Sequence, residues 1–256
     1  MKMNKKQHRI AHAAAAGLIV FCLLLLLCGC QKKEETKPSK GCDLSEECES
    51  YTETESFSDF KEAYESLNNT ENKAGKPYRT VAISQDHPFQ ETTAKDIVRR
   101  IEEKETFYVY VGDEMCPWCR SVIEKAIEIA SEAGIDKIYY LQIWDEEGNE
   151  VLRDKYVYED GEVKQELQAS EDYYRLLQEW EDFLSDYTLS DENGEKIMVG
   201  EKRIYAPNFI YVENGKIVRF TEGISDLQED SRQELTEEIL KEEETLFRAF
   251  FGIGEN

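Results

Sequence analysis

Two cysteines separated by two residues, Cys116 and Cys119, lie between a short apolar run and an amphipathic pattern. The run over 107–111 contains only aromatic and β-branched residues, which is typical of a buried strand. After Cys119, apolar residues recur at helical spacing over 122–130, and Gly134 suits the C-terminal cap of that helix. The sequence therefore predicts an α/β fold in which the cysteine pair lies where a strand runs into a helix.

The position of this pair predicts thiol chemistry. A helix N-terminus offers unpaired amide protons and a partial positive charge, which favour a thiolate over a thiol. The thiolate is the nucleophile in disulfide exchange. We expect Cys116, exposed just before the helix, to be the nucleophile. Cys119, in the first turn, would be the resolving thiol of a redox-active Cys116–Cys119 disulfide.

Other uses of such a pair have less support. A zinc site needs about four ligands, and only His87, Cys42 and Cys48 remain to complete one. Attachment of a c-type haem needs a histidine after the second cysteine, where this chain has Arg120. An inert structural disulfide would close a very small, strained ring. The sequence thus favours redox chemistry with no metal and no cofactor.

The first thirty residues have the order of an export signal. A basic segment without acidic residues comes first, with Lys2, Lys5, Lys6 and Arg9. An apolar run over 10–27 follows and ends in Leu27-Cys28-Gly29-Cys30, which resembles the lipobox of bacterial lipoproteins. This resemblance implies cleavage of residues 1–29 and a lipid on Cys30, which would anchor the chain to the extracytoplasmic face of the cell membrane. An uncleaved transmembrane helix is the alternative, since about 18 apolar residues could just span a bilayer.

The segment 30–76 predicts a flexible acidic tether, because it has few large apolar residues to bury. We allow for a short helix near its end, carrying Phe57, Phe60, Tyr64 and Leu67. Cys42 and Cys48 lie in this tether, where a small local disulfide is expected and a second redox pair is the alternative. The formal net charge of −24 becomes more negative when the basic signal is removed, which argues against a nucleic-acid partner.

Residues 77–256 predict one domain with a mixed central sheet flanked by helices. Its expected strands are 79–84, 107–111, 138–143, 208–212 and 216–220. Its expected helices begin at Thr93 and Ser170, follow Cys119, and span 231–251. Asp160-Gly161 and Asn214-Gly215 predict two hairpin turns.

Three linked features resemble the thioredoxin superfamily over about residues 79–251. The strand, the cysteine motif and the helix come in the order found in that family. The segment Gly200–Ile217 looks like the segment around the cis-proline of the family, and Gly223 falls where the family has a glycine after the following hairpin. The resemblance implies a thioredoxin-like fold with a cis Ala206-Pro207 bond that faces the cysteines; an ordinary trans proline is the alternative. In the family this loop binds an extended substrate chain by strand addition. The substrate-binding residues would then be Pro117, Trp118, Ala206 and Pro207.

The chain also departs from the family pattern. Thioredoxin has a buried acid six residues before its nucleophile, where this chain has Tyr110; Asp113 and Glu114 lie nearby, but we expect them to be solvated. The Pro-Trp dipeptide looks more like the Cys-Pro-aromatic-Cys centre of bacterial thioredoxin-like proteins known as bacteriocin transport accessory factors. The region 145–196 is longer than in thioredoxin and predicts an insertion, with a helix and a hairpin, that shapes partner choice.

These observations predict an enzyme, a membrane-anchored thiol–disulfide oxidoreductase that exchanges disulfides with exported proteins. Its implied partners are exported protein thiols or disulfides and a transmembrane redox partner, with the direction of electron flow left open. A non-catalytic accessory or binding lipoprotein for export of a peptide or protein partner is the alternative, and it predicts that Cys116→Ser leaves the role intact. A solute- or metal-binding lipoprotein is the third hypothesis, which no ligand cluster supports.

Overall fold

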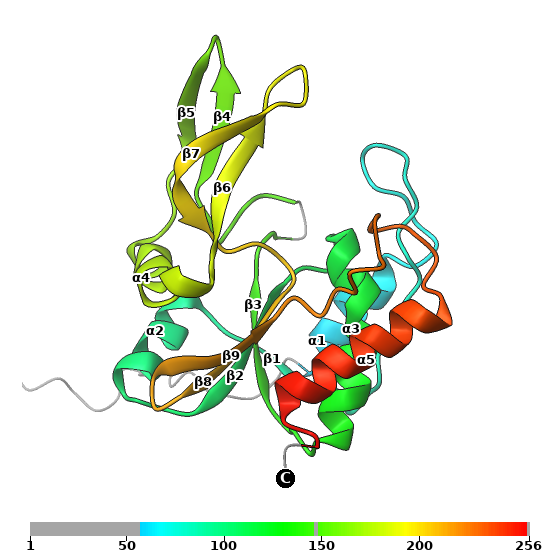
Figure 1. Ribbon diagram of the computed structural model, residues 1–256. Helices are drawn as coiled ribbons and strands as arrows, with labels where there is room; N and C mark the ends of the chain where they lie inside the picture. Colours follow the sequence, from blue (N-terminus) through cyan, green and yellow to red (C-terminus); the bar gives the residue numbers. More distant parts are fainter. Residues whose placement is uncertain (1–56, 146–147, 255–256) are drawn as a thin grey trace, which may run out of the picture. The chain divides into compact units, whose positions relative to one another are not determined.

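Five strands form the central sheet of the computed structural model, which describes residues 57–145 and 148–254 (Figure 1). In order across the sheet they are β1 (Phe89–Glu91), β3 (Ile138–Gln142), β2 (Phe107–Gly112), β8 (Asn208–Glu213) and β9 (Lys216–Thr221). Strands β1, β3 and β2 run parallel, whereas β8 is antiparallel to β2, and β9 is antiparallel to β8. The sheet is therefore mixed, as the sequence predicted.

Helices cover both faces of this sheet (Figure 1). One face carries α1 (Phe57–Ser66), α3 (Pro117–Glu132) and α5 (Glu237–Phe251), and the other carries α2 (Ala94–Glu102) and α4 (Glu171–Glu179). Each face has its own cluster of buried apolar side chains. The central strand β2 is buried on both faces, which explains its uninterrupted apolar sequence.

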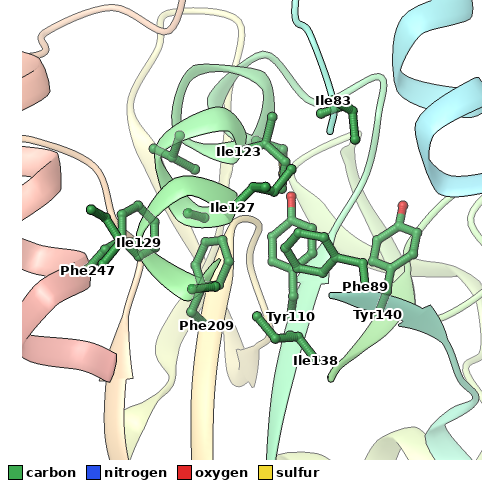
Figure 2. Close-up of a cluster of buried hydrophobic side chains, with 14 of the residues drawn as sticks. Ile83, Phe89, Tyr110, Ile123, Ile127, Ile129, Ile138, Tyr140, Phe209 and Phe247 are labelled. Atoms are coloured by element: carbon green, nitrogen blue, oxygen red, sulfur yellow. The ribbon is translucent and has the colours of Figure 1, made fainter. Parts of the chain in front are cut away.

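Aromatic rings dominate the core between the sheet and α3 (Figure 2). Tyr110 of β2 stacks between Phe209 of β8, with 4.5 Å between ring centroids, and Tyr140 of β3, at 5.5 Å. Phe89 of β1 lies beside the same ring, at 5.1 Å. Such ring pairs stabilise the core beyond the area they bury. The position of Tyr110 is therefore set by rings from three other strands, β1, β3 and β8.

Short sequence signals set the ends of several elements. Side chains of Thr93, Ser170 and Thr236 accept a backbone N–H three residues later, so α2, α4 and α5 each begin at a polar cap. Helix α5 consequently starts at Glu237, later than the expected residue 231. Both predicted hairpin turns have the positive φ angles that a type I′ turn needs, at Asp160, Gly161, Asn214 and Gly215.

The expected strand at 79–84 is wrong. Val81 and Ile83 are buried while Ala82 and Ser84 are exposed, which is the alternation of a strand. The segment nevertheless pairs with no strand among the described residues. Side chains hold its backbone instead. Asn68 exchanges two hydrogen bonds with Val81, and Glu65 accepts one from the Ile83 amide. The first strand of the sheet is β1.

The folded domain begins before residue 77, the boundary that the sequence predicted. Helix α1 places Phe60 and Tyr64, which are four residues apart on one face, in the core with 1% and 0% of their surface exposed. The ring of Phe60 contacts those of Phe89 and Tyr140, at 4.5 and 4.9 Å between centroids. These contacts join residues that are far apart in the sequence. In the sequence alone, the apolar residues of α1 therefore look like isolated residues in an acidic tether.

Two hairpins and a helix separate β3 from β8. The first hairpin pairs β4 (Lys155–Glu159) with β5 (Glu162–Leu167), and the second pairs β6 (Ser185–Ser190) with β7 (Lys196–Arg203). Between them lie α4 and a 3-10 turn at Glu181–Phe183. The second hairpin was not predicted, because its strands are mostly polar and exposed. It extends the insertion beyond the expected end at residue 196, to Arg203.

Candidate active site

Cys116 lies at the junction between β2 and α3. It occupies the N-cap position with an extended backbone (φ −75°, ψ 118°), and Pro117 is the first residue of the helix. Proline suits this position because its φ matches the helix and the first amides have no partner within the helix. Cys119 follows in the first turn. The sequence Cys-Pro-Trp-Cys thus places both sulfur atoms at a helix N-terminus, where negative charge is favoured.

The start of α3 favours the thiolate form of Cys116. The neighbouring Cys119 thiol has the largest effect, and the backbone amides of Cys119 and Trp118 add to it. Together they lower the pKa of Cys116 to about 7, although burial acts in the opposite direction. Both cysteines are free thiols in the structure. The thiolate of Cys116 is therefore favoured relative to that of an ordinary cysteine in the reduced pair.

Cys116 is less accessible than the sequence predicted. Only 7% of its surface is exposed, and the loop before β8 helps to cover it. The Ala206-Pro207 peptide bond in this loop is cis, as expected, and the Ala206 carbonyl oxygen accepts a hydrogen bond from the Cys116 Sγ at 3.7 Å. Pro207 is buried, and Trp118 is half-buried against the aromatic core. The fold thus brings the two predicted segments, around Cys116 and around Ala206, into one site.

Cys119 has the opposite character. It is fully buried, and burial raises the pKa of its thiol; the neighbouring Cys116 thiol and the charge there raise it further. The side chain of Tyr110, in the same buried cluster, opposes this effect. At a pH where Cys116 is a thiolate, Cys119 is therefore still a protonated thiol. This difference suits Cys116 for the first attack and Cys119 for a later step.

Asp113 and Glu114, which we expected to be solvated, are buried in the turn before Cys116. They are 0% and 5% exposed. The two carboxyl oxygens of Asp113 accept the backbone N–H groups of Met115 and Trp144, both at 2.9 Å. Burial raises the pKa of Asp113 to about 8, and Glu114 beside it adds to the rise. Trp144 is distant in sequence, so the residues around the motif did not reveal this burial.

Arg120, directly after Cys119, is a fully buried cation held by four oxygen acceptors. Its guanidinium donates to backbone oxygens of Arg79 at 2.7 Å, Tyr64 at 2.9 Å and Glu114 at 3.1 Å, and to Asn68 Oδ1 at 2.8 Å. These acceptors belong to α1, to the segment after it and to the turn before Cys116. Arg120 therefore ties the N-terminal part of the domain to the helix that carries the cysteines.

A second group of buried charges joins the insertion to the loop that faces Cys116. Glu150, Arg153, Asp154 and Arg203 form this group, which we call the ionic clasp. Arg153 pairs with Glu150 and donates to the Ile204 backbone oxygen at 3.2 Å. Arg203 donates to the Asp154 backbone oxygen at 2.7 Å. The charge of Arg153 also contributes to the lowered pKa of Cys116.

The other predicted sites are not placed by the structure. Cys30, Cys42 and Cys48, and with them lipid attachment and a local disulfide, lie outside the described residues. Within 57–145 and 148–254, no group of three or more His, Cys, Asp and Glu side chains is arranged to hold a metal ion. In the same part of the chain, no helix combines the length and the apolar character needed to cross a bilayer.

Comparison with known proteins found neither a protein-family model nor a curated protein that matches this chain.

Proposed function

We propose that this chain is a membrane-anchored, extracytoplasmic thiol–disulfide oxidoreductase with a thioredoxin-like fold, which exchanges disulfides with exported proteins. The observation that carries the proposal is the position of the Cys116 sulfur at the N-cap of α3, beside the Cys119 thiol, with a pKa lowered to about 7. A low-pKa thiol with a second thiol in contact has the two groups that exchange requires. The central mixed sheet, with α3 directly after β2 and the cis bond directly before β8, supports the fold assignment.

The reaction takes place in two exchange steps. The Cys116 thiolate attacks one sulfur of a partner disulfide, that disulfide bond breaks, and the other partner sulfur leaves as a thiolate and takes a proton. Cys119 then loses its proton and attacks Cys116, which releases the second partner sulfur and forms the Cys116–Cys119 disulfide. The partner gains two electrons and the cysteine pair loses two. A dithiol donor, the transmembrane partner of this proposal, returns the pair to the reduced state; the reverse sequence donates a disulfide.

The loop at Ala206-Pro207 supports binding of an extended polypeptide beside Cys116. The Ala206 carbonyl lies 3.7 Å from the reactive sulfur. A substrate strand that brings its sulfur to Cys116 approaches this backbone closely enough for main-chain hydrogen bonds, as in strand addition. Recognition through main-chain groups tolerates many substrate sequences, which suits an enzyme that acts on several exported proteins.

A redox titration of the full-length chain in glutathione buffers tests the proposal. We expect one reversible two-electron transition that Cys116→Ser and Cys119→Ser each abolish. The Cys42→Ser, Cys48→Ser double variant is the matched control and should keep the transition. A potential near about −270 mV would indicate a reductant, and one near about −120 mV a disulfide donor. If no reversible transition involves Cys116 and Cys119, the enzyme proposal fails and the non-catalytic binding role replaces it.

A further inference from the structure

Side chains hold the loop between β7 and β8, which takes part in neither strand pairing. Ile204, its first residue, donates its backbone N–H to the Tyr173 hydroxyl oxygen at 3.5 Å. The Ile204 backbone oxygen accepts a hydrogen bond from Arg153 Nη1 at 3.2 Å. Two residues later, the Ala206 carbonyl accepts the bond from the Cys116 thiol. The place of the carbonyl that faces the reactive sulfur therefore depends on how firmly Ile204 is held.

Arg153 divides its guanidinium between this loop and one carboxylate. Its Nε and Nη2 donate to the two oxygens of Glu150, the second at 3.1 Å, while Nη1 donates to the Ile204 carbonyl. The Arg153 side chain is buried, so water competes little for these bonds. A guanidinium is planar and holds its donors in fixed directions, so the paired bonds to Glu150 aim Nη1 at the loop. A lysine ammonium carries the same charge without this fork.

The same carboxylate is tied to the turn that leads to Cys116. Glu150 Oε2 accepts a hydrogen bond from Trp144 Nε1 at 3.2 Å, and Arg153 Cζ lies 5.4 Å from the centroid of the Trp144 ring. The Trp144 backbone N–H donates to Asp113 Oδ2 at 2.9 Å, in that turn. Two segments beside the reactive sulfur thus converge on one pair of buried charges. Such pairs often add little net stability, because desolvation offsets their attraction, so stability alone does not account for the arrangement.

We propose that Arg153 is a positioning residue, which holds the loop from Ile204 to Ala206 in the conformation that receives an extended partner chain beside Cys116. This inference rests on the proposed exchange activity and deepens it, because it assigns recognition of the polypeptide to a residue of the insertion. A substrate strand bonds to main-chain groups of the loop only while the loop is in place. When the loop is released for part of the time, the apparent affinity falls with the fraction of molecules that remain competent.

Two reagents separate recognition of a chain from reaction of the thiol. In one, the single cysteine of an extended peptide carries thionitrobenzoate in a disulfide bond; in the other, N-acetylcysteine amide carries the same group. The Cys116 thiolate attacks the cysteine sulfur, the S–S bond breaks, and thionitrobenzoate leaves with the electron pair as a coloured thiolate, since the thiol of lower pKa leaves faster. The assay uses full-length protein with Cys42→Ser and Cys48→Ser, after subtraction of the signal from the same protein with Cys116→Ser and Cys119→Ser.

We expect Arg153→Lys to raise the half-saturating concentration of the peptide reagent about fivefold or more, because the loop loses the fork that holds it. Lysine keeps the charge, so the maximal rate with the peptide and the rate with the amide reagent should each stay within about twofold. Glu150→Gln weakens the aim of the fork and should act in the same direction, which keeps the test available if Arg153→Lys does not fold.

Arg203→Lys is the matched control. Arg203 and Arg153 are both 6% exposed, but the Arg203 side chain pairs with Glu150 and donates to Asp154. The backbone of Arg203 is held by its pairing with Ser185 of β6. Loss of its guanidinium therefore leaves the start of the loop in place, and the half-saturating concentration of the peptide should stay within about twofold.

Hydrogen exchange of the Ile204 amide, followed by NMR, gives a reading that needs no substrate. This amide should exchange about tenfold faster in Arg153→Lys and within about twofold of the unsubstituted rate in Arg203→Lys. Unchanged peptide saturation in Arg153→Lys, or an equal rise in Arg203→Lys, would overturn the inference. If the unsubstituted protein reacts with neither reagent through Cys116, the proposed oxidoreductase fails instead. Exchange of the Ile204 amide then still decides whether Arg153 holds the loop.

Discussion

Replacement of Phe60 with alanine tests whether α1 belongs to the folded core. The ring of Phe60 is 1% exposed and contacts the rings of Tyr64, Phe89 and Tyr140, with centroids 4.6, 4.5 and 4.9 Å away. Loss of a buried phenylalanine ring costs about 3–5 kcal/mol, because its contacts are lost and a cavity remains. The hydrogen bonds of Arg120 hold α1 in place, so the cavity cannot close readily. We therefore expect a value in the upper half of this range.

Urea unfolding followed by tryptophan fluorescence measures this loss. With a slope of about 3 kcal/mol per molar urea for a domain of this size, the midpoint should fall by about 1.3–1.7 M. Phe183→Ala is the matched control, because Phe183 is 40% exposed, and it should lose less than about 1 kcal/mol. Equal shifts for the two variants would refute the assignment of α1 to the core. Phe60→Leu keeps most of the volume and provides the comparison if the alanine variant does not fold.

Three further predictions concern buried charge and backbone conformation. The pKa of Asp113 is raised from 3.8 to about 8 by burial, so the native state holds a proton that the unfolded chain has lost. Its contribution to stability therefore falls by a few kcal/mol as the pH rises from about 4 to 8. The stability of Asp113→Asn, measured by thermal unfolding, should depend less on pH. If its pH dependence equals that of the unsubstituted protein, the raised pKa of Asp113 is contradicted. Arg120→Met removes four hydrogen bonds to buried or part-buried oxygen atoms and should cost about 3–5 kcal/mol in urea unfolding, whereas the exposed Arg99→Met should cost less than about 1 kcal/mol. Gly215→Ala, at φ +76°, places a Cβ 2.4 Å from a backbone oxygen and should lower the melting temperature more than Gly194→Ala, which has φ +82° and open space; similar losses of about 1–2 kcal/mol for both would contradict the contact.

Elements marked by neighbouring residues could be predicted, and elements held by distant residues could not. The cap at Thr93 and the turn at Asn214-Gly215 depend on short-range chemistry, and the structure has both as expected. Buried Val81 and Ile83 alternate with exposed residues, and this pattern is the same whether the backbone of the segment hydrogen-bonds to another strand or to a side chain. Only the folded structure shows that Asn68 takes the place of the strand.

The candidate site divides in the same way. Cys116 and Cys119 stand out in the sequence because their spacing and their place before a helix have a specific chemical use. The burial of Asp113 depends on Trp144, which the chain brings to it after β3. The direction of the Tyr110 ring depends on Gly112, and a glycine two residues away in a strand does not by itself indicate which ring lies over it.

The ionic clasp has a consequence for how this chain can diversify. Arg153 and Arg203 close the two ends of the insertion onto each other just before the loop that faces Cys116. The hairpin tips at Gly161 and Gly194 face open space, with no atom within 4 Å of an added Cβ. Exposed tips of this kind accept insertions and exchanges of sequence. The tips of both hairpins can therefore change in sequence or length, by evolution or by engineering, and so bind new partners. The thiol chemistry at Cys116 and Cys119 stays the same.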